Sequence, residues 1–383
     1  MGTRYQRGSR YREPVRVLQV FKDYYPPTRG GIEQHINDLV HSMPSVDFEV
    51  LTSSRSRRLV VDDDEGVRVT RAPEFARPTS TPITPAWRRL LRDGRFDVIH
   101  FHSPNPFGEL MMLSTSTPPV VVTYHADIVG RRLALPFFRP FQKLFLNSAR
   151  TIIVSNPRLA EATSLAHHAK RVRVIPFGID ASKWEERPPQ ADELRDIHRP
   201  PLVLFVGRLA YYKGLDILID AMEDVDATAV IVGVGPERSN LETRAASRRG
   251  RVLFVGEVPD QVRKAYLHAA DVFVLPSTSK AETFGISALE AMATGTPVIT
   301  TELGTGTSWV NQDGLTGRVV RPGDAAALGA AINEILLDET RAKEMGAKAS
   351  ERAKTTFSKT TMLTDLQSVY DSALKGPLPG SRA

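Results

Sequence analysis

Residues 202–214, with the sequence LVLFVGRLAYYKG, decide the fold. The five apolar residues Leu202 to Val206 predict a strand buried on both faces, because they show no alternation with polar residues. Gly207 ends this run, and helical spacing over residues 215–222 follows Lys213-Gly214. A buried strand, a glycine turn and a helix form the first half of a βαβ unit. The stretch therefore predicts an α/β fold with a parallel sheet.

The same alternation of short apolar runs and amphipathic stretches covers most of the chain. Two sets of strand-like runs are separated by residues 177–201, which are interrupted by glycine and proline and are interpreted as a linker. We expect two doubly wound, Rossmann-like domains over residues 1–185 and 186–360, and a C-terminal helix and tail over 361–383 that returns to the N-terminal domain. The expected strands are 15–21, 48–52, 67–71, 98–102, 120–124, 151–155, 202–206, 229–233, 252–255, 272–276 and 297–301, and the expected helices include 32–42, 86–93, 215–222, 259–269 and 361–374.

Composition limits the class of protein. The chain has 383 residues and 41% apolar content, which suits two domains with separate cores. It has no cysteine, and therefore no disulfide or catalytic thiol. Residues 1–13 lack the apolar core of a signal peptide, and no run approaches the ~18 apolar residues of a membrane span, so we expect a cytoplasmic protein. A net charge of +6 and a pI of about 9.5 favour anionic partners, but no nucleic-acid-binding motif accompanies them.

Two cations and two carboxylates follow strands of the second set. Arg208 comes directly after a strand and Lys213 stands before the next helix; a planar fork and a point charge together suit a diphosphate. Glu282 lies in the loop after another strand, and Glu290 lies about one turn into the helix that follows. Taken singly, these residues also fit solvated loop cations, an exposed helix residue and a helix cap.

The backbone around Phe284 and Gly285 lies at the start of that helix. Free amides and the helix dipole favour an anion at such a position. A carboxylate on either side could accept hydrogen bonds from sugar hydroxyls. For the two glutamates alone, a helix cap and an exposed helix residue are the favoured interpretation, and the combination with the other motifs decides otherwise.

The order and spacing of these motifs resemble the donor half of glycosyltransferase family 4. The resemblance implies the GT-B fold, an α/β fold with two Rossmann-like doubly wound domains facing a central cleft, the N-terminal one binding the acceptor and the C-terminal one the nucleotide-sugar donor. The motifs that carry it are Gly207-Arg208, Lys213-Gly214, Gly233-Val234-Gly235-Pro236, Pro276-Ser277, Glu282, Glu290 and Gly295-Thr296-Pro297-Val298, with Pro26-Pro27, Gly30-Gly31, His125 and residues 175–180 in the first domain.

Roles follow from that resemblance. Arg208 and Lys213 are expected to neutralise the donor diphosphate, and Glu290 to hold the ribose hydroxyls. Glu282, with the amides of Phe284 and Gly285, is expected to hold the transferred sugar. His125 is expected to contact that sugar from the opposite domain, after domain closure, and Gly31 to approach the phosphates or the acceptor. The resemblance assigns catalysis to His125, Arg208, Lys213 and Glu282, and donor binding to Gly31, Arg208, Lys213, Glu282, Phe284, Gly285 and Glu290; it implies no metal and no cofactor, since the nucleotide sugar is a substrate.

The implied activity is that of a retaining hexosyltransferase. The acceptor attacks on the face from which the nucleotide leaves, and the acceptor is a saccharide or a lipid-linked saccharide. Residues 301–311, TELGTGTSWVN, resemble family members that build bacterial exopolysaccharide and O-antigen, many of them mannosyltransferases. This favours GDP-mannose as the donor and leaves UDP-glucose or another UDP-sugar open.

A basic, aromatic-rich stretch is open to two interpretations. Its cations and apolar side chains suit the anionic inner face of a membrane, and they equally suit an ordinary core with a charged edge. The basic segment formed by Arg88, Arg89, Arg92 and Arg95 adds to the first interpretation. The stretch contains Arg131, Arg132, Leu133, Leu135, Phe137, Phe138, Arg139, Phe141, Lys143, Leu144 and Phe145.

Two other classes of protein make different demands on the sequence. An NAD-dependent oxidoreductase requires a glycine fingerprint after the first strand, where this chain has Asp23-Tyr24-Tyr25-Pro26-Pro27. A non-catalytic nucleotide-sugar-binding protein would share the motifs and stays open. His100 and His102 are interpreted as structural because alternate strand residues face the core. The acidic residues 62–64 are interpreted as a solvated loop.

Overall fold

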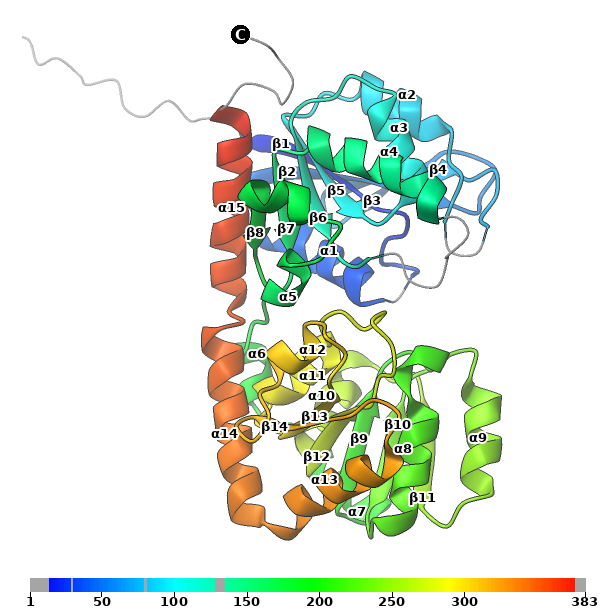
Figure 1. Cartoon of the computed structure of the whole chain (residues 1–383), viewed down its shortest axis with the longest axis vertical. Helices are drawn as coiled ribbons and strands as arrows, with labels where there is room; N and C mark the ends of the chain where they lie inside the picture. The colour runs from blue at the N-terminus through cyan, green and yellow to red at the C-terminus, as the bar shows by residue number, and fades with distance from the viewer. Residues whose placement is uncertain (1–13, 29, 79–80, 128–134, 376–383) are drawn as a thin grey trace, which may run out of the picture. The chain divides into compact units, whose positions relative to one another are not determined.

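The computed structural model describes residues 14–28, 30–78, 81–127 and 135–375 (Figure 1). The chain divides into two compact units. The first unit contains residues up to Thr123, Pro140–Thr151 and residues from Val369 onward. The second contains Tyr124–Arg139 and Ile152–Ser368.

A six-stranded parallel sheet organises the second unit. Its strand order is β11-β10-β9-β12-β13-β14, so the order reverses between β9 and β12. This is the doubly wound arrangement expected from the sequence. The strands are β9 (Leu202–Val206), β10 (Thr228–Val232), β11 (Arg251–Gly256), β12 (Val272–Leu275), β13 (Val298–Thr301) and β14 (Gly317–Val320); the helices are α7 (Gln190–His198), α8 (Leu215–Ala221), α9 (Arg238–Ala246), α10 (Asp260–Ala269), α11 (Ile286–Ala293), α12 (Thr307–Val310), α13 (Ala325–Leu337) and α14 (Glu339–Thr355).

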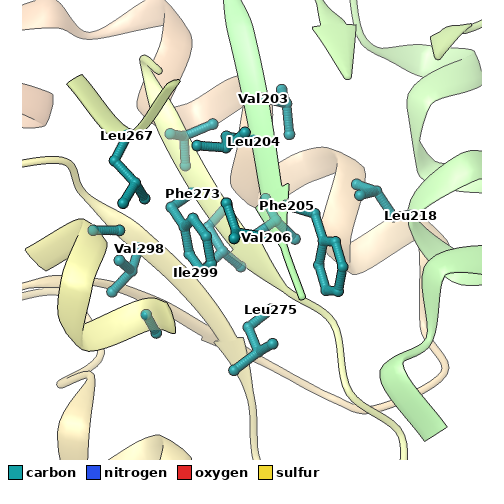
Figure 2. Close-up of a cluster of buried hydrophobic side chains, with 14 of the residues drawn as sticks. Val203, Leu204, Phe205, Val206, Leu218, Leu267, Phe273, Leu275, Val298 and Ile299 are labelled. Carbon is teal, nitrogen blue, oxygen red and sulfur yellow. The ribbon is translucent and has the colours of Figure 1, made fainter. Parts of the chain in front are cut away.

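The apolar side chains of β9 form the centre of this unit's core. Every residue of β9 is buried, and Phe205 and Phe273 are fully enclosed. Figure 2 shows these rings with Leu218 of α8 and Leu275 of β12, next to Ile299 of β13. Burying a side chain of this size stabilises the fold by about 1.5–3 kcal/mol. The continuous apolar run of β9 thus reflects a strand covered by helices on both faces.

An eight-stranded sheet has the order β3-β4-β2-β1-β5-β6-β7-β8. The pairings of β1 with β2 and β5, of β2 with β4, and of β7 with β8 are parallel, whereas β3 and β4 form an antiparallel pair. The strands are β1 (Val15–Val20), β2 (Val46–Ser54), β3 (Val60–Asp64), β4 (Val67–Pro73), β5 (Val98–Ser103), β6 (Val120–Tyr124), β7 (Thr151–Val154) and β8 (Val172–Val174); the helices are α1 (Gly31–Ser42), α2 (Ala86–Asp93), α3 (Pro106–Leu113), α4 (Leu135–Ser148) and α5 (Pro157–Ala160).

Several elements differ from the sequence prediction. The presumed linker contains the short helix α6 (Ser182–Glu185) and the whole of α7. Pro188 and Pro189 lie between these two helices, and Pro200 and Pro201 follow the end of α7. Strand β3 was not expected, because its acidic residues hide the strand pattern. The expected C-terminal helix is α15 (Lys359–Lys375), and its residues from Val369 onward group with the first unit.

Candidate functional site

The predicted cations and carboxylates follow the two strands at which the sheet order reverses. Arg208 comes two residues after β9, and Glu282 lies in the loop after β12. In open α/β sheets, ligands bind outside the carboxyl ends of the strands at this reversal point. The structure therefore places both residues at the edge where a ligand is expected.

Glycines allow the loop after β9 to pass close to its neighbours. Gly233 follows β10 with a φ of +136°, and a Cβ there would lie 2.0 Å from the Gly207 carbonyl oxygen. Gly214 has a φ of +65°, and a Cβ there would lie 2.1 Å from the Pro276 carbonyl oxygen. A larger residue could occupy neither position without moving the loop. Arg208 is exposed on the loop that these glycines shape.

Lys213 and Glu282 form an ion pair beside this loop. Lys213 Nζ lies 2.5 Å from Glu282 Oε2, and the two side chains are only 12% and 11% exposed. Ser277 Oγ donates to the same carboxylate oxygen at 3.3 Å. Burial lowers the pKa of Lys213, but Glu282 and Tyr212 outweigh it and raise the pKa. Lys213 therefore stays cationic, and the Glu282 carboxylate is its anionic partner.

The start of α11 follows Glu282 closely. Gly285 has a φ of +88° and immediately precedes the helix, and a Cβ there would lie 2.9 Å from Leu275 Cδ2. The ring of Phe284 is buried. Thr305 Oγ1 donates to the Glu282 carbonyl at 2.7 Å and fixes the loop from the other side. The first turn of α11 thus follows Glu282 by only a few residues, and the helix dipole favours negative charge at this end of the helix.

Glu290, in the second turn of α11, pairs with a residue that sequence reasoning missed. Arg263 Nη1 of α10 donates to Glu290 Oε2, and its other terminal nitrogen lies 3.3 Å from Asp260 Oδ1. The Arg263 guanidinium also lies 5.4 Å from the ring centre of Trp184. Burial raises the pKa of Glu290, and Arg263 partly counteracts that effect. No sequence signal links these residues, because they come from three separate elements.

His125 and Gly31 belong to different compact units. His125 immediately follows β6, is 2% exposed and stacks on Phe177 at 5.9 Å between ring centres. It groups with Glu282, Phe284 and Glu290 in one compact unit, and not with the first unit as expected. Gly31 is exposed at the first position of α1 and belongs to the first unit, so its contact with donor or acceptor stays a prediction.

His100 and His102 are structural, as predicted. Both are buried in β5 and stack on each other at 4.6 Å. His100 bonds Thr123 Oγ1 at 2.6 Å and Tyr370 Oη at 2.8 Å, and His102 bonds Gln19 Oε1 at 2.8 Å. Burial, together with the charge of His35, lowers the pKa of His100 to about 3, so its ring is neutral.

Residues 62–64 form the end of a strand and not the expected loop, although Asp62 and Asp63 are exposed to solvent as expected. They belong to β3, and each of the three carboxylates has a specific partner; Asp63 accepts from the Gly66 backbone N–H at 2.9 Å. Asp62 accepts from Arg71 Nε at 2.7 Å, and Asp64 accepts from Tyr24 Oη at 2.8 Å and from Asn37 Nδ2 at 2.9 Å. Because an edge strand can carry charge on its open side, the acidic composition does not prevent a strand here.

The basic, aromatic stretch is divided between core and surface. Arg131, Arg132 and Leu133 lie outside the described residues, as do the side chains of Leu135 and Phe137. Phe145 is buried, whereas Phe141 is 47% and Leu144 55% exposed on α4. Within the described ranges, no helix combines the length and apolar character needed to cross a membrane. The same residues contain no group of three or more His, Asp or Glu side chains placed to hold a metal ion.

Comparison with known protein families matches both halves of the chain. Residues 29–183 match the model of Glycosyltransferase Family 4, and residues 187–352 match that of Glycosyl transferases group 1. The solved structures that resemble the chain include a sucrose-phosphate synthase from Thermosynechococcus elongatus (TM-score 0.77, 22% identity, 94% of this chain and 98% of that one). Another is HepE from Anabaena in complex with UDP (TM-score 0.76, 20% identity, 94% and 100%). At these identities the likeness establishes the fold alone, and that fold is GT-B.

Two curated relatives cover nearly the whole chain. The D-rhamnosyltransferase WbpZ of Pseudomonas aeruginosa is 37% identical over 351 residues, covering 90% of this chain and 92% of its own length. The O-antigen chain mannosyltransferase C of Escherichia coli is 34% identical over 370 residues, covering 94% and 99%. The two family models, the fold and these relatives agree with the residues at the reversal point of the sheet: the chain is a glycosyltransferase of family 4 with the GT-B fold.

Proposed function

We propose that this chain transfers mannose, or a 6-deoxy relative of mannose, from a GDP-linked donor to a saccharide or lipid-linked saccharide. The observation that carries the proposal is the set of groups at the reversal point of the second sheet: Arg208, the buried Lys213–Glu282 pair and the start of α11. A mannosyltransferase and a D-rhamnosyltransferase among the relatives support the choice of sugar. A UDP-sugar donor is the alternative.

The reaction proceeds with retention. The acceptor hydroxyl oxygen forms a bond to the anomeric carbon while the bond from that carbon to the phosphate oxygen breaks. The acceptor's proton passes to the leaving phosphate. Arg208 and Lys213 stabilise the charge that develops on the diphosphate, without a metal ion. Glu282, His125 and the amides of Phe284 and Gly285 hold the sugar, and Glu290 holds the ribose.

A nucleotide panel tests this function. Thermal stability is measured with GDP, UDP, ADP, GDP-mannose, UDP-glucose and NAD, since a ligand at one hundred times its dissociation constant adds about 2.7 kcal/mol of stability. We expect GDP and GDP-mannose to stabilise the wild type, and Arg208→Ala and Glu290→Ala to lose the effect. The matched control is Arg251→Ala, an arginine at the amino end of β11 that should leave the effect intact. Stabilisation by UDP alone would mean that the donor is a UDP-sugar, and stabilisation by NAD alone would refute the proposed function.

Transfer itself tests the mechanism. NMR of the product from an α-linked donor should show an α linkage, and activity should survive a metal chelator. A β linkage would contradict retention. Loss of activity on chelation, restored by a divalent ion, would contradict metal independence. GDP-mannose binding without any turnover on acceptors from membrane extracts would favour the non-catalytic alternative.

We also propose that α4 contacts the inner face of a membrane. Phe141 and Leu144 are exposed one helical turn apart, and the exposed cations Arg139 and Lys143 flank them. Exposed apolar side chains among cations suit an anionic lipid surface.

Vesicle sedimentation tests the contact. Phosphatidylglycerol vesicles should bind the wild type more than phosphatidylcholine vesicles do. The double variant Phe141→Gln, Leu144→Gln should lose this binding. The control is Leu337→Gln, which removes a leucine that is still more exposed, from the end of α13. Equal binding by both variants would refute the role of α4.

A further inference from the structure

A continuous series of aromatic contacts joins His125 to the start of α11. The imidazole of His125 and the ring of Phe177 are stacked with 15° between their planes. Phe177 in turn meets the ring of Phe284 edge to face, with centres 5.0 Å apart. All three side chains are buried and belong to one compact unit. Phe177 therefore touches two residues that the proposed function places around the transferred sugar.

The backbone beside Phe177 is fixed by a short pairing with the segment before α15. Ile179 N donates to the Phe357 carbonyl at 2.7 Å, and Lys359 N donates to the Ile179 carbonyl at 3.1 Å. At Gly178, a Cβ would lie 2.6 Å from the Lys359 Cα, so the two backbones are in direct contact. The backbone of Phe177 therefore cannot move relative to this segment without breaking the pairing.

The far side of Phe284 is equally well packed. Its ring meets Phe357 at 5.7 Å and Trp309 at 6.4 Å, both in edge arrangements. The guanidinium of Arg352 covers Trp309 and Phe357 at 5.7 and 5.2 Å, and its nitrogens donate to the carbonyls of Trp309 and Val310. Edge-to-face contacts have preferred angles, so this packing sets the tilt of each ring.

We infer that Phe177 is a positioning residue for sugar transfer, which fixes the orientation of the His125 imidazole relative to the first amides of α11. The inference rests on the proposed function, in which both groups contact the sugar. A catalytic group must be held within a fraction of an ångström by the residues that pack around it. Loss of the Phe177 ring lets the imidazole tilt while leaving Arg208 and Lys213 in place.

Kinetics of two Phe177 variants test the inference. The matched control is Phe145→Leu, which also removes a fully buried ring with an edge contact, to Phe101 at 4.9 Å, in the first unit. Phe177→Leu should lower kcat by roughly tenfold to a hundredfold, the scale of a small misplacement at a reacting centre. The Kd for GDP should change less than about twofold, since the diphosphate groups are untouched. Phe177→Tyr keeps the ring and should recover most of kcat, and Phe145→Leu should lower the thermal midpoint while leaving kcat unchanged.

Two kinetic results would overturn the inference. One is a kcat for Phe177→Leu no lower than that of Phe145→Leu. The other is a parallel loss of kcat and GDP affinity, which would mean that the donor site as a whole collapses.

If the wild type turns over no nucleotide sugar, the proposed function fails, and NMR of ¹⁵N-labelled histidine decides the positioning role by itself. A single His125 signal that becomes several or broadens in Phe177→Leu, and is restored in Phe177→Tyr, supports that role. An unchanged signal overturns it.

Discussion

At the scale of single residues, the Lys213–Glu282 pair shows how the site holds its charges before a donor arrives. The ammonium already has a carboxylate partner, so under the proposed function a nucleoside diphosphate competes with Glu282 for it. Fully exposed, these side chains would gain little from pairing, but only about a tenth of each is in contact with solvent. Their interaction therefore matters for both stability and binding.

Replacement of Glu282 by glutamine separates these two effects. In Glu282→Gln, the Lys213 cation loses its counter-charge, and we expect the free energy of unfolding to fall by about 3 kcal/mol. GDP should then stabilise the variant more than it stabilises the wild type, because phosphate oxygens replace the missing carboxylate. Turnover should fall by about a hundredfold with the loss of a sugar contact. Urea unfolding with and without GDP measures the first two effects, and a smaller GDP effect in the variant would contradict this account.

The residues of the site were predictable to different degrees. Arg208, Lys213, Glu282 and Glu290 lie in the loops and helices that follow two predicted strands, so the sequence alone could group them. Arg263 and Trp184 could not be identified from the sequence, because an arginine in an amphipathic helix and a single tryptophan in a short helix belong to no recognisable motif. Only packing shows that Arg263 meets Glu290 and that Trp184 meets Arg263.

At the scale of elements, strand β3 anchors the loop that leads into α1. Tyr24 and Asn37 both bind the Asp64 carboxylate, and Asn37 Nδ2 lies 3.0 Å from Tyr24 Oη. Burial, followed by the hydrogen bond to Asp64, raises the pKa of Tyr24, so its hydroxyl remains a donor. The loop before Gly31 is thereby held by β3, a strand that its acidic sequence did not predict.

Removal of the Tyr24 hydroxyl should loosen this anchor. We expect Tyr24→Phe to lower the free energy of unfolding by about 1.5–3 kcal/mol, the range for a hydrogen bond to a charged group. Chemical denaturation of the variant measures this, with Tyr211→Phe as the control because Tyr211 is 76% exposed. A loss no greater than that of the control would show that the anchor is not formed in solution.

His41 makes the same region sensitive to pH. Its Nδ1 lies 2.7 Å from the Asn37 carbonyl and its Nε2 lies 3.0 Å from the Asp64 carbonyl. Carbonyls only accept hydrogen bonds, so only the doubly protonated ring satisfies both. Burial lowers the pKa of His41, but these carbonyls and the carboxylates of Asp64 and Glu65 outweigh it and raise the pKa above its ordinary 6.5.

The sign of the pH dependence follows from that raised pKa. The stabilisation is fully present below about pH 6.5 and is lost as the pH rises through the folded-state pKa. Wild type should therefore be more stable than His41→Gln at about pH 6, and the difference should shrink by about pH 9. Urea denaturation of both proteins at the two pH values checks this, and a constant difference would exclude titration of His41 as the cause.

At the scale of the whole molecule, the alternation of buried strands and helices was enough to predict two doubly wound domains. Strand β9 was predicted to the residue, since its apolar run has sharp ends at Pro201 and Gly207. The path of the C-terminal helix required the structure. Tyr370 of α15 is fully buried, and Gln19 and His100 both bond to its hydroxyl group.

Truncation of that contact should destabilise the first unit selectively. Tyr370→Ala removes a fully buried ring and leaves two polar partners unsatisfied, and we expect a loss of about 3–5 kcal/mol. Hydrogen exchange should show the loss first in β1 and β5, which carry Gln19 and His100. Equal acceleration of exchange in β9 and β12 would mean that the two units unfold as one.

The position of Val369–Lys375 has a consequence during synthesis on the ribosome. These residues complete a unit whose other parts end at Thr151, so more than two hundred residues must be translated before the unit can close. At about 5–20 residues per second, the buried surface around Gln19 and His100 waits tens of seconds for its last helix.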